Sequence, residues 1–310
     1  MYTLLLGLLL IQAAPAAPSP EDQVVAAVTS LLQSDQTERA LTLLQPFVKA
    51  NPRARRAAVL LSFVYVRQGK YEQARVMAEQ LATELPRDYY TQHVLGLSLF
   101  GLNRYDEAES HFKRAIELKP DFGESVMQLG LLQLGKGSFE AARTSFQRML
   151  ELGYRPNEAH KNLGSILIKQ GRYAEAISEL NAALKVDAAS ASTYFLLADA
   201  LRKSGNTEAA TEATKRFQAL NDVETDQRLR FAKAQAFYQQ GMQLMFGKNQ
   251  EFLTANFPAA RNAFAQAVET LPQLDGGFYR LAQIDYLRND YDNAVRNIRL
   301  ALTAVDWKDL

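Results

Sequence analysis

The sequence has no cysteine, almost no net charge and only three histidines. Without cysteine there can be no disulfide framework, thiolate metal site, Fe–S cluster or cysteine nucleophile. Its 35 Lys and Arg residues balance 34 Asp and Glu residues, so the net charge is +1. This charge provides no field that would hold nucleic acid or an anionic membrane. Nevertheless, 47% of the 310 residues are hydrophobic, which is a globular composition.

Long hydrophobic runs are also missing, and the run from Leu4 to Ile11 is well short of the ~20 residues that span a membrane. Small residues follow it, and Ala14-Pro15-Ala16 suits signal-peptide cleavage. We therefore expect residues 1–16 to be a signal peptide and residues 17–20 a short Pro-rich leader. The protein is then periplasmic or secreted. The alternative is an uncleaved N-terminal segment, which would be the chain's only membrane contact.

Motifs that carry chemistry are scarce. The stretch from Gly130 to Gly137 approaches a phosphate-binding loop, but Gly137 stands where Ser or Thr is required. His93, His111 and His160 lack the spacing of a metal site. We therefore expect no enzymatic activity, no cofactor and no metal.

What the sequence does have is a repeat with a spacing of 34 residues. Ungapped registers start at residues 21, 55, 89, 123, 157 and 191. Register position 20 is alanine in every copy, position 8 is small in most, and position 17 is mostly aromatic. The position-20 alanines are Ala40, Ala74, Ala108, Ala142, Ala176, Ala210, Ala260 and Ala294. Because small residues let two helices approach closely, this pattern predicts packed helix pairs.

Each repeat has the pattern of two helices joined by a tight turn. Apolar residues follow helical spacing, and a break falls near Asn103 or at an equivalent glycine. Proline closes several units at position 32: Pro52, Pro86, Pro120 and Pro272. The segment LGLSLFGLNRYDEAESHFKRAIELKP, from Leu95 to Pro120, closely resembles the tetratricopeptide repeat. The resemblance covers residues 21 to about 306 and implies an all-α fold, a right-handed α-solenoid superhelix of antiparallel helix pairs.

The repeat becomes irregular near the middle of the chain. We predict a regular array over residues 21–220, whose last helix ends near Asn221 and Asp222. We expect a hinge and helix extension at 221–233 and a new helix from Thr225 to about Phe246. A C-terminal helix pair then spans 234–310, with an insertion within 247–257.

The resemblance also implies a concave groove lined by the first helix of each unit. Register positions 5, 9 and 12 give the candidate partner-binding residues Val59, Phe63, Val66, His93, Leu97, Phe100, Met127, Leu131, Leu134, Lys161, Arg202, Tyr238 and Met242. The earlier part of this set is apolar, which favours protein partners. Lys161 and Arg202 would select an acidic neighbour. In the alternative interpretation, tight curvature or the N-terminal segment buries the apolar stripe as core.

These features predict an exported protein–protein interaction scaffold that binds an extended peptide or a partner helix in the groove. The alternative is a structural or assembly subunit of a bacterial envelope machine, acting through its convex face and C-terminal end. No polar closing helix follows the last repeat, and Trp307 is the sole tryptophan. We therefore expect weak self-association through the C-terminal end.

Overall fold

The protein is described by a computed structural model that covers residues 18–246 and 251–304. The predicted signal peptide at 1–16 and Trp307 lie outside the described residues, as does part of the predicted insertion, residues 247–250.

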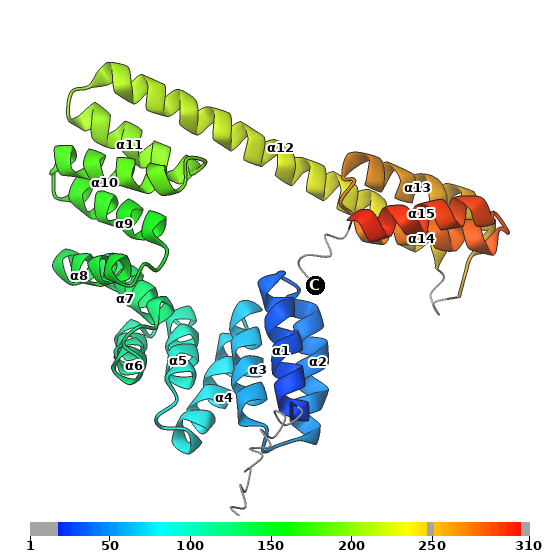
Figure 1. Ribbon diagram of the computed structural model, residues 1–310, viewed down its shortest axis with the longest axis horizontal. Coiled ribbons are helices and arrows are strands. Elements are labelled where there is room, and N and C mark those ends of the chain that lie inside the picture. Colours follow the sequence, from blue (N-terminus) through cyan, green and yellow to red (C-terminus); the bar gives the residue numbers. More distant parts are fainter. Residues whose placement is uncertain (1–17, 247–250, 305–310) are drawn as a thin grey trace, which may run out of the picture. The chain divides into compact units, whose positions relative to one another are not determined.

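The described residues are almost entirely helical, which confirms the all-α prediction (Figure 1). The α-helices are α1 (Pro20–Gln33), α2 (Thr37–Ala50), α3 (Arg55–Arg67), α4 (Tyr71–Glu84), α5 (Tyr89–Gly101), α6 (Tyr105–Leu118), α7 (Gly123–Gly135), α8 (Phe139–Glu151), α9 (Pro156–Lys169), α10 (Tyr173–Val186), α11 (Ala191–Lys203), α12 (Thr207–Met245), α13 (Phe257–Thr270), α14 (Asp275–Leu287) and α15 (Tyr291–Ala304). A short 3-10 helix, η1 (Thr254–Asn256), precedes α13. Within these ranges, extended pairing is limited to an isolated bridge between Phe246 and Phe252. No helix there combines the length and apolarity needed to cross a membrane.

The chain divides into two compact units, Met1–Arg155 and Pro156–Leu310. The first contains the helix pairs α1/α2, α3/α4, α5/α6 and α7/α8. In the second, α9 pairs with α10, α11 with the first part of α12, the last part of α12 with α13, and α14 with α15. This division lies far from the boundary that the sequence suggested at 221–233.

A residue in the left-handed backbone conformation ends the first helix of seven pairs. It always occupies register position 15, and glycine, asparagine or aspartate stands there because these residues tolerate positive φ best. The seven are Asp35 (φ 56°), Gly69 (71°), Asn103 (61°), Gly137 (75°), Gly171 (74°), Gly205 (86°) and Asn289 (63°). The hydrogen bond from the Lys70 N–H to the Tyr65 carbonyl, at 2.9 Å, shows how the chain then reverses.

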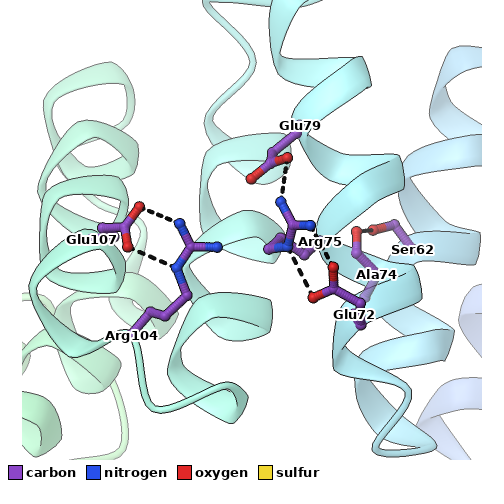
Figure 2. Close-up of polar contacts among 7 residues, drawn as sticks. All are labelled: Ser62, Glu72, Ala74, Arg75, Glu79, Arg104 and Glu107. Atoms are coloured by element: carbon purple, nitrogen blue, oxygen red, sulfur yellow. Dashed lines mark hydrogen bonds and ion pairs between the residues drawn. The ribbon is translucent and has the colours of Figure 1, made fainter.

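The repeated small residues form the contact between the two helices of each pair. All eight alanines at register position 20 are buried. In α3/α4, the Ser62 hydroxyl at position 8 donates to the Ala74 carbonyl at position 20, at 2.9 Å (Figure 2). The register therefore predicts the core correctly, because only small side chains fit where the helix axes are closest.

The predicted helix end near Asn221 and Asp222 is wrong, because α12 continues through both residues as one helix of 39 residues. Asp222 stands at position 32, where four of the units have a proline after the second helix. No glycine or proline interrupts residues 206–240, so the sequence is compatible with one continuous helix. Residues 221–233 are exposed, and ion pairs one turn apart stabilise this stretch, such as Arg230–Asp226 at 2.8 Å.

The surfaces on either side of this exposed stretch are polar. In most units, positions 7 and 10 of the first helix are apolar and buried against the preceding pair, as Leu129 and Leu132 are in α7. The corresponding residues of α12 are Gln240 and Gln243, and both are exposed. The pair formed by α11 and the first part of α12 therefore does not stack on the pair formed by the last part of α12 and α13. The face that would make this contact has lost its apolar side chains, and with them the hydrophobic driving force.

Candidate protein-binding surface

The first helices of the pairs form the inner surface of each array. Within the first unit, α1 contacts α3 and α3 contacts α5, and within the second α9 contacts α11. The second helices of successive pairs make no comparable contacts in the described chain. When one set of helices lies closer together than the other, the stack curves and that set lines the concave side.

The nine candidate residues of the first unit differ in their exposure. Phe100 and Leu131 are each 37% exposed and can meet a partner directly. The half-buried members are Phe63, Val66, Leu97, Met127 and Leu134. Val59 and His93 are only 4% exposed, so placing these two in an open groove was wrong. Both lie at position 5, which the neighbouring helices cover in α3 and α5.

His93 is a packing residue that joins successive first helices. Its Nδ1 lies 2.9 Å from the Ser125 hydroxyl of α7. The ring stacks on Tyr90 and meets Phe122 edge-on, at centroid distances of 6.0 and 5.1 Å. Burial lowers the pKa of His93 to about 3, so the imidazole is neutral at physiological pH.

Five side chains form what we call the apolar strip: Phe63, Leu97, Phe100, Leu131 and Leu134. They come from α3, α5 and α7 and follow positions 9 and 12 of the register. Their inner sides pack on the core, as Phe63 and Leu97 do, while their outer sides remain accessible. The strip can therefore bind apolar side chains without a large rearrangement.

Next to the strip, a cavity of about 410 Å³ opens at the N-terminal ends of α3 and α5. Val25 and Thr29 of α1 line one side, and Arg56, Val59 and Tyr90 line the other. Of these residues, only Val59 was predicted from the sequence. The register contained the signal for the others: Val25 and Thr29 are positions 5 and 9 of the first unit, and Arg56 and Tyr90 are both position 2.

Polar contacts hold α1 against α3 at this cavity. Arg56 pairs with Asp22, and the Ala57 N–H donates to Glu21 Oε1 at 3.0 Å. The hydrogen bonds from Ser19 and the contact with Arg56 lower the pKa of Asp22, so this carboxylate stays ionised. Burial, assisted by the charge of Glu124, raises the pKa of Tyr90. The Tyr90 hydroxyl therefore remains protonated and can donate a hydrogen bond to a ligand.

The candidate residues of the second unit have different environments. Lys161 pairs with Glu158 at 2.6 Å, whereas the Arg202 side chain is 64% exposed and lies 3.9 Å from the Asp199 carboxylate. Arg202 is thus the more accessible cation. Tyr238 and Met242 are half-buried and pack against the core of α12, α13 and α14. They contribute more to packing than to an open surface.

The second helices carry charges that neutralise one another. Figure 2 shows Arg75 of α4 between Glu72 and Glu79, at 2.5 and 2.6 Å, and Arg104 paired with Glu107 at 2.6 Å. Hydrogen bonds to these arginines lower the pKa values of Glu72 and Glu107. The outer face here therefore presents paired charges and no uniform field.

The remaining motifs lie within helices. Residues 130–135 belong to α7, and Gly137 forms the turn after it, so the stretch lacks the strand that precedes a phosphate-binding loop. No group of three or more His, Asp or Glu side chains that could hold a metal ion occurs in residues 18–246 and 251–304.

Comparison with known proteins identifies the family. A tetratricopeptide repeat model matches residues 25–89, 64–121, 93–155 and 127–193, which together span more than half of the chain. The chain belongs to the tetratricopeptide repeat family, whose members generally mediate protein–protein interactions. No curated protein matches the sequence.

Solved structures share the fold at low sequence identity. PilF of Pseudomonas aeruginosa is 19% identical, with a TM-score of 0.57 over 64% of this chain and 91% of its own. A thermophilic repeat protein of Thermus thermophilus is 23% identical, with a TM-score of 0.51 over 58% of this chain and 98% of its own. The chain spans 52% of the matched chain in the Cut9–Hcn1 complex, at 13% identity and a TM-score of 0.49.

Proposed function

We propose that this protein is an exported scaffold that binds an extended peptide or a partner helix along the concave face of its first unit. The observation that carries the proposal is the apolar strip with its adjacent cavity. Phe100 and Leu131 are exposed on this strip although neighbouring residues of the same helices are buried. Exposed apolar surface of this kind on a folded domain usually marks an interaction site.

The strip and the cavity favour a particular partner chemistry. A large apolar side chain that enters the strip would contribute roughly 1.5–3 kcal/mol when it is fully buried. The Tyr90 hydroxyl at the cavity can fix the orientation of a ligand by donating a hydrogen bond to a carbonyl or carboxylate oxygen, whereas the Arg56 guanidinium is already paired with Asp22. A carboxylate at Lys161 would have to compete with Glu158, which leaves Arg202 as the better cation for an acidic neighbour.

The test is a pair of double variants with matched chemistry. Phe63→Ala with Phe100→Ala should reduce capture of the cellular partner at least tenfold. The control, Leu43→Ala with Val76→Ala, removes exposed apolar side chains from the second helices α2 and α4 and should leave capture unchanged. Both proteins should retain the helical circular dichroism of the wild type. Equal capture by the two variants would eliminate the strip as the binding surface.

Export is the second part of the proposal. It is supported by the apolar run Leu4–Ile11 and the Ala14-Pro15-Ala16 site in the sequence. N-terminal sequencing of the protein from the expressing cell should begin at Ala17, and the protein should fractionate with the periplasm or the medium. A mature chain that begins at Met1 in the cytoplasm would contradict this part and leave the binding surface unaffected.

A role as a subunit of an envelope assembly is favoured by a different observation, the exposed apolar side chains of α14 and α15. In that case charged substitutions on these helices would block assembly, and substitutions in the apolar strip would be silent.

A further inference from the structure

The last described helix pair has an open apolar face. Tyr279 and Tyr286 of α14 are 53% and 63% exposed, and Val295 and Ile298 of α15 are 53% and 39% exposed. These four side chains line one cavity of about 520 Å³ between the two helices. Nothing within residues 251–304 packs over it.

The equivalent surface of α5/α6 shows which element packs over such a cavity. His93 and Phe112 occupy the register positions of Tyr279 and Ile298, yet they are only 4% and 0% exposed. The first helix of the next pair, α7, covers them, with Ser125 against His93 and Leu129 and Leu132 in the same core cluster. The cavity on α14/α15 is therefore the place where a further helix would pack.

At the interruption in α12, the unstacked face of α11/α12 is mixed, because Phe195 at position 5 is 57% exposed whereas position 24 is polar. Position 24 of the second helix is apolar and buried in most pairs, but it is Thr214 in α12, where the stacking is interrupted. The face of the next repeat that would pack on it lies on the last part of α12 and carries Gln240 and Gln243 at positions 7 and 10. On α15 the same position holds Ile298, and its apolar surface is retained. Apolar, exposed residues at both position 5 (Tyr279) and position 24 (Ile298) therefore distinguish α14/α15 as a face on which a further helix can pack.

Charge specifies one more feature of such a helix. In α6, Asp106 at position 18 and Glu109 at position 21 accept hydrogen bonds from Lys136, the residue after α7, at 2.7 and 2.8 Å. α15 keeps an acidic residue at position 18, Asp292, and has Val295 at position 21. A basic residue in the last turn of the bound helix would therefore find a partner at Asp292.

We propose that the open face of α14/α15 binds an amphipathic helix of another protein, which carries a small residue, two leucines and a basic residue at the spacing i, i+4, i+7 and i+11. This is the spacing of Ser125, Leu129, Leu132 and Lys136 in α7. A second copy of the chain does not supply such a helix, because the corresponding faces of α1 and α12 carry Gln23 and Ser30, and Gln240 and Gln243. The proposal is independent of the concave surface of the first unit.

The probe is a fluorescently labelled synthetic peptide with the sequence of residues 121–137, titrated with the full chain while anisotropy is measured. Saturable binding is expected, and Ile298→Glu should weaken it at least tenfold. Leu229→Glu is the matched control, because Leu229 is 67% exposed on α12 away from the cavity. A peptide with Leu129→Gln and Leu132→Gln, which copies the polar face of α12, should not bind. Asp292→Asn should weaken binding a few-fold.

Ile298 is partly exposed, so its substitution should leave the helical circular dichroism unchanged, and Tyr286→Ser provides a second variant that does not depend on Ile298. The proposal is overturned if the peptide fails to bind or binds the Ile298→Glu and Tyr286→Ser chains as tightly as the wild type. It is also overturned if light scattering shows a dimer that Ile298→Glu converts to a monomer, because a second copy would then occupy the face.

Discussion

Replacing Gly96 by alanine tests how tightly the small register positions control helix pairing. A Cβ atom on Gly96 would lie 2.7 Å from a ring carbon of Phe112, which is completely buried. Overpacking of this kind costs about 1–3 kcal/mol, because the ring or the helix must move. Replacing glycine by alanine within a helix stabilises the helix by about 1 kcal/mol. We therefore expect a net loss of about 0–2 kcal/mol in the free energy of unfolding.

Two further glycines provide graded controls in the next pair. A Cβ on Gly130 would lie 3.0 Å from the Phe146 ring, and a Cβ on Gly135 would meet nothing within 4 Å. Gly130→Ala should therefore be nearly neutral, and Gly135→Ala should stabilise the protein by up to about 1 kcal/mol. The expected order of stability is Gly135→Ala, Gly130→Ala, Gly96→Ala.

The assay is urea unfolding followed by circular dichroism, combined with amide hydrogen exchange because repeat arrays can open in parts. Adding Phe112→Leu to the Gly96→Ala protein replaces the ring by a smaller side chain and should restore part of the lost stability. The packing argument would be refuted if Gly96→Ala were as stable as Gly135→Ala.

The remaining predictions concern charge and stacking. Asp285→Ala leaves the half-exposed Arg261 without its 2.6 Å partner, and we expect a loss of about 1–3 kcal/mol in thermal unfolding. Because the pKa of His93 is depressed to about 3 in the folded protein, only the unfolded chain gains this proton between pH 7.5 and 5. Stability should therefore fall over that range by about 2 kcal/mol, and His93→Gln should flatten the slope measured by urea unfolding. Gln240→Leu with Gln243→Leu makes the exposed face of α12 apolar, so light scattering should show a larger mass than that of the wild type at the same concentration.

The sequence predicted the parts of the fold that depend on a local repeat. The buried alanines at position 20 and the left-handed residue at position 15 follow from which side chains fit two close helices and a tight turn. The exposure of position 5 was not predictable in this way, because His93 is buried by contacts with α7 whereas Tyr279 at the same position is open. Continuity of α12 through Asp222 was not predictable from position 32, because Ala188 also replaces proline there and α10 nevertheless ends at Val186.

The candidate surface was predicted in part. Phe100 and Leu131 are accessible, and whether they bind a partner stays a prediction; Arg56 and Tyr90 were missed because position 2 was not followed through the register. The open face of α14/α15 depends on which helices stack in three dimensions, and its apolar residues resemble core residues when only the sequence is considered.

The central claim is that partners bind the concave face of the first unit, and site-specific photocrosslinking in the producing cell tests it most directly. A photoreactive amino acid would replace Leu131 on the apolar strip or, in a separate protein, Val76 on α4, which is 53% exposed. We predict a discrete crosslinked partner from position 131 and none from position 76. Crosslinks to the same partner from position 76 alone, or equally from both positions, would contradict the account.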